Sequence, residues 1–452
     1  MGKLAITGGN PVQTSYSEEL FHWPVVNDAM RRAQLEVLES GNMSGTDIAE
    51  RFEAEYAKWQ GHRYALSHNN GTSALTAAMY GLGVSAGDEV ICTTLTYWAS
   101  CIGALQLGAS VVFCDIDPET LQMSPESLES KITARTKLVI VVHYMAYPSD
   151  MDRIMAIARK HGLKVLEDVS HAHGGHYKGR MLGTFGDAAA MSLMSQKSLA
   201  VGEAGMLVTD ELEVYRRAIR YGHYDRISTV WKPEEYRRTN ELPVGGVKNR
   251  MHQCAAAVGL EQLKKYDREM REIDAAMKYF WAGLDGVGGL RIMYPREAGS
   301  DKAGWYASRC HYDPAAFGGV SSATFMKALN AEVGHFAFSN GCNFPLHLST
   351  LFTDEDIYGY GAPTARFFRK DGSNPGDVTG RLPVAEGITP LLLGEPWFKH
   401  NDHGLIDPYI EAVRKVAANF QELLDIDGDS ASKVGGVALS HRRRGGKEAS
   451  AL

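Results

Sequence analysis

Residues 188–209 read AAAMSLMSQKSLAVGEAGMLVT, in which two apolar runs flank a short loop that carries one lysine, Lys197. We expect the runs 188–194 and 205–209 to form strands, because short apolar runs next to Gly and Ser are typical of buried strands. A lysine that acts as a nucleophile must be neutral, and partial removal from water favours the neutral form. Composition alone favours an ordinary surface lysine. The stretch therefore predicts strand, loop and strand, and it leaves the chemistry of the lysine open.

Short apolar runs of the same kind recur upstream of this stretch. Segments of helical character lie between several of them, among them 72–82, 98–107 and 149–161. Buried strands that alternate with amphipathic helices indicate an α/β fold, in which a mostly parallel sheet has helices on both faces. The seven expected strands are 63–67, 89–93, 110–115, 138–144, 164–168, 188–194 and 205–209.

The composition is that of an ordinary globular protein. Hydrophobic residues make up 44% of the 452-residue chain and charged residues 22%, which argues against disorder, collagen and coiled coil. The net charge of -7 argues against a general nucleic-acid surface. The basic run 441–444 is expected to be part of a solvated terminus.

Six scattered cysteines form no C-x-x-C pair, which argues against a zinc ribbon or a disulfide scaffold and favours a reducing compartment. The first eleven residues do not resemble a signal peptide. No apolar run reaches the roughly 18 residues that a membrane-spanning helix needs. We therefore expect a cytoplasmic protein without a membrane or nucleic-acid partner.

A chain of this length is expected to hold about two to three domains. The helix 28–40 should end at Gly41, and the polar stretch 224–248 should be a long loop, which is often functional. The expected parts are an N-terminal arm and helix (1–45), a large domain (46–284), a smaller α+β domain (285–424) and a flexible tail (425–452).

A candidate phosphate site follows the first expected strand, in the run Asn69-Asn-Gly71-Thr72-Ser-Ala that opens an Ala-rich helix. The first amides of a helix have no internal partners, and the helix dipole is positive there. Gly71 would let the backbone approach a ligand closely, so the run fits a phosphate cradle. An ordinary turn capped by Thr72 is the alternative. The run is not G-x-G-x-x-G, so a nicotinamide site fits poorly.

Two carboxylates, Glu167 and Asp168, end another expected strand, and open α/β sheets bind ligands at that end. A buried carboxylate is costly without a cationic partner, so a protonated ring nitrogen would suit it. A capping aspartate at a loop is the alternative. His171, His173 and His176 follow, but no matching Cys or carboxylate spacing accompanies them, and we expect no metal.

Four motifs then occur in a fixed order, and together they resemble one family. The chain resembles the DegT/DnrJ/EryC1/StrS family of pyridoxal-phosphate (PLP) dependent sugar aminotransferases, which have the aspartate-aminotransferase fold, type I. The resemblance runs from about Gly8 to Leu424 and is weakest at 224–244 and 299–376. The motifs are Gly71-Thr72, Glu167-Asp168-x-x-His171, Ser192-x-x-x-x-Lys197 and Gly202-Glu203-x-Gly205.

Two shorter runs narrow the branch of the family. Gly8-Gly-Asn-Pro-Val12 and His171-Ala-His173-Gly are similar to inosose (cyclitol) aminotransferases and to the aminohydroxybenzoate-synthase group. Enzymes of those groups serve aminoglycoside and ansamycin pathways, so the resemblance implies a role in aminosugar or antibiotic biosynthesis.

The resemblance implies PLP as the cofactor and three catalytic residues. Lys197 would hold PLP as a Schiff base and shuttle the proton. Asp168 would pair with the pyridine nitrogen and keep it protonated, and His171 would lie near the ring hydroxyl or the phosphate.

The remaining cofactor contacts are also implied by the resemblance. Tyr97 matches the aromatic residue that stacks on the ring, while Gly71, Thr72 and Ser192 would hold the phosphate. In many members an Asn of the partner subunit, in a motif like G-x-N-x-R-M, also reaches that phosphate.

In this chain the corresponding run is Gly246-Val-Lys248-Asn-Arg250-Met251, in which Lys248 stands at the place of the Asn. Lysine can bind a phosphate as a point charge, so Lys248 is the expected contact. The resemblance thus implies a homodimer with shared active sites. The run Gly202-Glu-Ala-Gly205, where Gly-Glu-Gly-Gly is more usual, is a second departure.

The expected reaction moves an amino group from glutamate or glutamine to PLP and then to a keto-sugar or keto-cyclitol. A PLP-dependent sugar dehydratase or an aminohydroxybenzoate-synthase-like enzyme is an alternative, but in the deoxygenating branch His typically replaces the lysine, and Lys197 argues against it. A sensory protein that binds PLP without turnover is an alternative of another class. The intact set of Lys197, Asp168 and His171 argues against that one.

Overall fold

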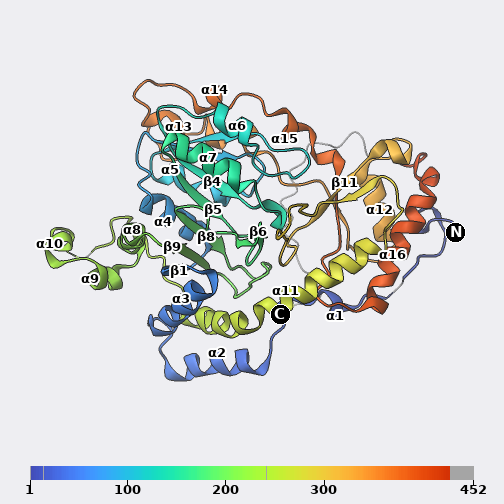
Figure 1. The fold of residues 1–452 in the computed structure, drawn as a ribbon, viewed down its shortest axis with the longest axis horizontal. Helices are drawn as coiled ribbons and strands as arrows, with labels where there is room; N and C mark the ends of the chain where they lie inside the picture. The colour runs from blue at the N-terminus through green and yellow to red at the C-terminus, as the bar shows by residue number, and fades with distance from the viewer. Residues whose placement is uncertain (1, 14, 241, 428–452) are drawn as a thin grey trace, which may run out of the picture.

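A seven-stranded sheet forms the centre of the larger part of the molecule in the computed structural model, which describes residues 2–13, 15–240 and 242–427 (Figure 1). The strand order is β1-β9-β8-β5-β4-β2-β3. All neighbours from β8 to β3 are parallel, whereas β9 is antiparallel to both β1 and β8. This confirms the predicted mostly parallel α/β sheet. The strands are β1 (Tyr64–His68), β2 (Glu89–Thr93), β3 (Ser110–Cys114), β4 (Thr136–Val142), β5 (Lys164–Asp168), β8 (Ala188–Ser192) and β9 (Gly205–Thr209).

Helices cover both faces of this sheet, so neighbouring side chains of one strand enter different hydrophobic cores. Val139 of β4 belongs to the cluster that contains Ile154, and Ile140 belongs to the cluster that contains Ala77. Residues buried on both sides of a strand explain why these strands appear as continuous apolar runs in the sequence. The covering helices are α3 (Asp47–Gln60), α4 (Gly71–Gly81), α6 (Pro125–Ser130), α7 (Met151–His161), α8 (Leu212–Gly222) and part of α11 (Gln253–Ala282).

Four expected elements differ from the structure, and one of them is the strand predicted at 188–194, which ends at Ser192. The strand predicted at 138–144 ends at Val142, because the chain then enters a turn in which Met145 has φ 54° and Ala146 φ 60°. The helix predicted at 98–107 is interrupted and consists of η2 (Trp98–Ser100) and α5 (Gly103–Gln106). The stretch 224–248 is not a plain loop, since it contains η4 (Tyr224–Arg226), α9 (Ile227–Val230), α10 (Pro233–Tyr236) and η5 (Arg237–Thr239).

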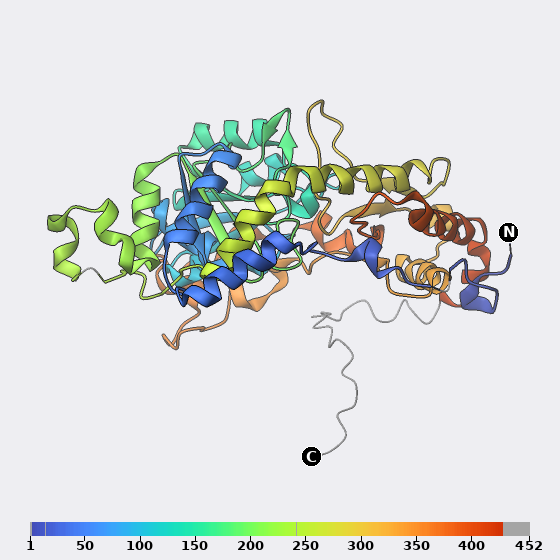
Figure 2. The ribbon, with the colours of Figure 1, turned by 90° about the horizontal axis from the view of Figure 1, so that it is seen from below.

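The 30-residue helix α11 runs from beneath the large sheet to a smaller α+β unit (Figures 1 and 2). An antiparallel sheet with the order β10-β11-β13-β12 forms the centre of this unit. Its elements are β10 (Leu290–Ile292), β11 (Arg309–Tyr312), β12 (Ser339–Asn340), β13 (Leu392–Gly394), α12 (Ser322–Val333) and α16 (His403–Ala418).

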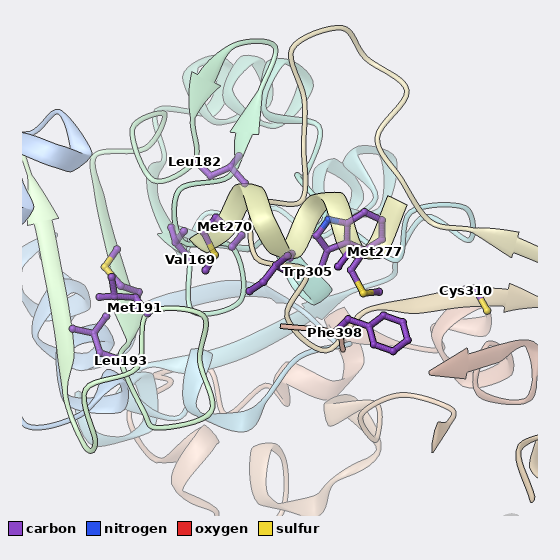
Figure 3. Close-up of a cluster of buried hydrophobic side chains, with 14 of the residues drawn as sticks. Val169, Leu182, Met191, Leu193, Met270, Met277, Trp305, Cys310 and Phe398 are labelled. Carbon is purple, nitrogen blue, oxygen red and sulfur yellow. The ribbon is translucent and has the colours of Figure 1, made fainter. Parts of the chain in front are cut away.

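One hydrophobic core joins the two parts of the molecule. Figure 3 shows it passing from Met191 of the large sheet, through Met270 on α11, to Trp305 and Phe398 near the small sheet. The core therefore fixes the loop around Trp305 against the large sheet.

Residues 346–391 return from the smaller unit to the edge strand β3. Ser110 Oγ donates to the Ala365 carbonyl at 2.7 Å, and the Phe113 amide donates to Thr379 Oγ1 at 3.0 Å. The Asp115 carboxylate accepts from the amides of residues 384 and 385. Part of the stretch 285–424 is thus bound to the large sheet, and the domain limits named above stay predictions.

The helix α2 (Asp28–Ser40) has the predicted limits. The Asn27 side chain accepts from the Met30 amide at 2.9 Å, and Gly41 ends the helix with φ 68°. From α2 the N-terminal chain continues to the smaller unit (Figure 2). No helix within 2–427, the uncertain positions 14 and 241 aside, is long and apolar enough to cross a membrane. The tail predicted at 425–452 lies outside the described residues from 428 onward.

Candidate active site

The N-terminus of α4, at Gly71, packs closely against Ser192 and Gly205, and we call this helix end the cradle. Asn70 caps the helix by accepting from the Ser73 amide at 2.8 Å, which leaves the earlier amides of α4 free for a ligand. A Cβ on Gly71 would lie 2.6 Å from Cβ of Ser192, and a Cβ on Gly205 would lie 2.3 Å from the Asn70 carbonyl oxygen. Both positions therefore require glycine. This close approach brings Ser192, Gly71 and Thr72 together at a helix end that attracts anions.

Asp168 is the last residue of β5 and is 3% exposed. Its carboxylate accepts from Ser100 Oγ at 2.7 Å and from the Ser170 amide at 3.0 Å. No cation of the described chain lies within 4 Å of it. A buried carboxylate that holds only neutral donors is suited to a cationic partner from a ligand.

Lys197 lies in the loop after β8 and is 8% exposed. Its amide donates to the Met194 carbonyl at 2.8 Å, and its own carbonyl accepts from Trp23 Nε1 at 2.9 Å. Burial lowers the pKa of Lys197 to about 8, although the Asp168 carboxylate acts in the opposite direction. A large share of this amine is therefore neutral near pH 8, as a nucleophilic lysine requires.

The ring of Tyr306 covers Lys197, with Nζ 4.2 Å from the ring centroid. The same ring contacts His171 at 4.6 Å between centroids. Tyr306 lies between Trp305 and Ala307, whose φ angles are 53° and 54°. Such angles are strained for residues other than glycine, and strain of this kind concentrates at functional sites.

The three histidines after β5 do not come together. His171 Nδ1 accepts from the Met145 amide at 3.2 Å, and burial together with Lys197 lowers its pKa well below the ordinary value. Burial also lowers the pKa of His173 to about 3, so both rings are neutral. His176 pairs with Asp301 at 2.9 Å. Within the described residues, no group of three His, Cys, Asp or Glu side chains could hold a metal ion.

Of the expected cofactor contacts, Tyr97 lies at the exposed edge of this cluster and Lys248 lies outside it. Tyr97 is 49% exposed and packs against Trp98 at 5.0 Å between ring centroids. Lys248 is exposed, and its Nζ lies 5.3 Å from the ring of Tyr224. In the described part of the chain, Lys248 makes no hydrogen bond or ion pair with the α4 cradle.

Lys248 instead lines a separate hollow of about 750 Å³. Arg250 is held by Asp225 at 2.7 Å, and the Asn249 carbonyl accepts from the Asn69 amide at 2.8 Å. The backbone of this run thus lies beside the α4 cradle of its own chain, whereas the Lys248 and Arg250 side chains contact Tyr224 and Asp225 instead. The other residues that line the hollow are Tyr224, Asp225, Asn240, Leu242, Pro243, Gly246 and Val247.

Three residues that contact Lys197 or Asp168 were not expected from the sequence: Trp23, Ser100 and Tyr306. Ser100 could have been found, because it follows the matched Tyr97 at a fixed short distance. Trp23 and Tyr306 lie far from Lys197 in the sequence, and Tyr306 falls within 299–376, where the resemblance is weakest.

A helix N-terminus that is suited to an anion, a buried carboxylate without a cation within 4 Å and a buried lysine of lowered pKa lie at the carboxyl ends of parallel strands. This arrangement, beside a smaller α+β unit, defines a PLP-dependent transferase. The model of the DegT/DnrJ/EryC1/StrS aminotransferase family matches residues 26–366. The chain belongs to this family, and it is a PLP-dependent aminotransferase.

Relatives match almost the whole chain. L-glutamine:2-deoxy-scyllo-inosose aminotransferase of Streptoalloteichus tenebrarius is 33% identical over 441 residues, which cover 93% of this chain and 99% of that protein. The spore coat polysaccharide biosynthesis protein SpsC of Bacillus subtilis is 32% identical and covers 87% of this chain and 95% of its own. An aminotransferase structure from Psychrobacter cryohalolentis has a TM-score of 0.74 at 28% identity and covers 88% of this chain and 99% of that chain. 3-Amino-5-hydroxybenzoic acid synthase shares the fold, with a TM-score of 0.71 at 24% identity over 90% of this chain and 99% of that chain.

Proposed function

We propose that this enzyme transfers the amino group of glutamine or glutamate to a keto-cyclitol, with keto-sugars as the wider acceptor class. The observation that carries the proposal is the buried Lys197 of lowered pKa beside the cation-free carboxylate of Asp168. Support for the acceptor comes from the relative of Streptoalloteichus tenebrarius that covers 93% of this chain and is named for glutamine and 2-deoxy-scyllo-inosose. We place the reaction in aminocyclitol or aminosugar biosynthesis of the kind that yields antibiotics, and in the cytoplasm.

The residues present fit PLP. The amides at the start of α4, with Thr72 and Ser192, would hold the phosphate, and the collision at an added Cβ explains Gly71 there. The Asp168 carboxylate would accept the N–H of the ring nitrogen in place of the missing cation. Tyr97, which is half exposed beside the site, would stack on the ring once the cofactor is bound.

When bound, PLP supplies an electron sink for the bond that is broken at the donor carbon. Lys197 Nζ would take and return the proton at that carbon, because it is buried and burial lowers its pKa to about 8. His171 remains neutral beside it, so its ring can accept or donate a hydrogen bond without adding charge. Tyr306 limits the access of water to Lys197.

We further propose that the working unit is a homodimer in which the run with Lys248 and Arg250 serves the neighbouring site. In the single chain, Lys248 lies over Tyr224 rather than at the cradle. The helices α9 and α10 project from the body of the molecule (Figure 1). A PLP phosphate carries nearly two negative charges, and a helix N-terminus offsets only about half a charge. Exposed apolar side chains near Lys248, among them Leu242, Val244 and Val247, are suited to a subunit interface.

The test separates the two half-reactions. The PLP-loaded protein is mixed with glutamine or glutamate, and the loss of the cofactor absorbance is followed together with the keto acid released. The aminated form is then mixed with 2-deoxy-scyllo-inosose and with keto-sugars. Reduction with borohydride before the first step, followed by peptide mapping, should place the cofactor on Lys197. A label on another lysine, or no reaction with either amino acid, would overturn the proposal.

A further inference from the structure

We infer that Arg309 binds the carboxylate of the amino-acid donor, which makes it a specificity residue for the first half-reaction only. This inference rests on the proposed function, because it assumes an amino acid as donor. Arg309 is the first residue of β11, three positions after Tyr306. It stood outside all the motifs that the sequence suggested.

The register of β11 turns Arg309 toward the large sheet. Cys310 and Tyr312 are each 2% exposed and pack into the core of the smaller unit. Side chains alternate along a strand, so Arg309 and His311 share the opposite face. His311 Nε2 lies 2.8 Å from the carbonyl oxygen of Glu119, which belongs to the larger part. The face that carries Arg309 therefore borders the space between the two parts.

A chain of contacts connects Arg309 with the lysine site. Arg309 Nε donates at 2.8 Å to the carbonyl of Gly341, which begins the run 341–343. Asn343, in that run, accepts from the hydroxyl of Tyr144. The Tyr144 ring lies 5.6 Å from that of His171, and His171 lies 4.6 Å from Tyr306.

The positive charge of Arg309 affects the pKa values of His171 and Tyr306, which border this space. It lowers the pKa of His171, after burial, Lys197 and His173, and it opposes the rise in the pKa of Tyr306 that burial causes. The guanidinium therefore lies close enough to the rings of His171 and Tyr306 for its charge to act on both.

The guanidinium has unused donors. Of its five N–H groups, one on Nε reaches the Gly341 carbonyl, and Nη1 reaches the carbonyls of Ala307 and Ser308 at 3.0 and 2.9 Å. Among the described residues, Nη2 has no partner and no carboxylate lies within 4 Å of Arg309. Gly394 opposite leaves room, since a Cβ there would lie 2.9 Å from Nη1.

Arg309 forms no ion pair within the described residues, although its charge and that of the buried Glu395 carboxylate attract each other over a longer distance. A positioned, half-buried arginine with unused donors is suited to a further carboxylate. Of the two proposed substrates, glutamine and glutamate carry one, whereas a keto-cyclitol does not. The inference therefore predicts different effects on the two half-reactions, which a merely structural role of Arg309 would not produce.

The experiment compares Arg309→Gln with Arg309→Lys and with Arg291→Gln. Arg291 is a matched control, because it lies on the neighbouring strand β10 and is already paired with Glu119 at 2.8 Å. Arg309→Gln should raise the half-saturating glutamine concentration about 10- to 100-fold, as expected for the loss of a charge-assisted bond. The rate and half-saturation with 2-deoxy-scyllo-inosose should change less than about 3-fold. Arg309→Lys should recover part of the loss, and Arg291→Gln should behave as the wild type.

A binding measurement without turnover completes the test. Glutarate is a five-carbon dicarboxylate without an amine, and its binding to the PLP-loaded protein can be followed by calorimetry. The wild type and Arg291→Gln should bind it, and Arg309→Gln should not. Equal losses in both half-reactions, or unchanged glutarate binding, would overturn the inference. If the wild type binds glutarate through Arg309 but reacts with no amino acid, the proposed function fails while the carboxylate site stands.

Discussion

Lys197 of the cofactor-free protein should become reactive at a lower pH than an ordinary lysine. Burial lowers its pKa from 10.5 to about 8, and a difference of about 2.5 units corresponds to a roughly 300-fold larger neutral fraction at pH 7. The protein is exposed briefly to pyridoxal between about pH 6 and 10, trapped with borohydride and mapped by mass spectrometry. Labelling of Lys197 should rise about tenfold per pH unit and then level off near pH 8.

Lys178 provides the control within the same sample. Its ion pair with Asp152, at 2.6 Å, raises its pKa, so its labelling should still be rising at the top of the range. Asp168→Asn should move the plateau of Lys197 to lower pH, because the carboxylate favours the ammonium form and raises this pKa. Asp152→Asn should change Lys178 alone. A Lys197 profile that parallels Lys178 would refute the reasoning, and so would one that Asp168→Asn leaves in place.

Three further outcomes are expected. Gly71→Ala should weaken PLP affinity about 5- to 150-fold, the equivalent of about 1–3 kcal/mol of overpacking. Gly288→Ala, which has open space around it, should leave the affinity unchanged. Titrations of the two apoproteins with PLP compare them, and equal affinities would show that the start of α4 does not hold the phosphate. Lys197→Met should make the cofactor-free protein more stable to urea by up to about 3 kcal/mol at pH 7. A buried lysine with a depressed pKa destabilises the fold below pH 8, and this destabilisation disappears as the pH rises from 8 to 10.5. If the difference in unfolding free energy between the variant and the wild type does not shrink over that range, the reasoning is wrong. Mixing inactive Lys197→Ala with an inactive Lys248/Arg250 double variant should restore part of the activity after subunit exchange, and no recovery despite proven exchange would exclude shared sites.

The parts of the fold that follow local rules were predictable. The seven strands appear as apolar runs, and the limits of α2 follow from Asn27 and Gly41, which satisfy the end groups of the helix within the same segment. Asp168 ends a buried strand and Lys197 follows another, and the strand ends of a parallel sheet meet at one edge. The order of the motifs then selected both residues. Their chemical roles stay predictions.

The parts that depend on distant contacts were not predictable. The break of the helix expected at 98–107 turns Ser100 toward Asp168, and no local pattern announces a hydrogen bond between residues so far apart. Arg309 is identical in type to many surface arginines, and only its place on β11 opposite Gly394 distinguishes it. The return of 346–391 to β3 likewise depends on single side chains such as Thr379.

The length of α11 has a mechanical consequence. At 1.5 Å per residue its 30 residues span about 45 Å, so a tilt of roughly 5° at one end displaces the other by about 4 Å. That displacement is larger than a hydrogen bond, and the far end carries the small sheet with Arg309. The stretch 346–391, which returns from the smaller unit and binds β3, is a second connection that limits such a tilt. Substitutions where α11 contacts α2, far from any reacting atom, should therefore affect the reaction by shifting Tyr306 and Arg309 relative to Lys197.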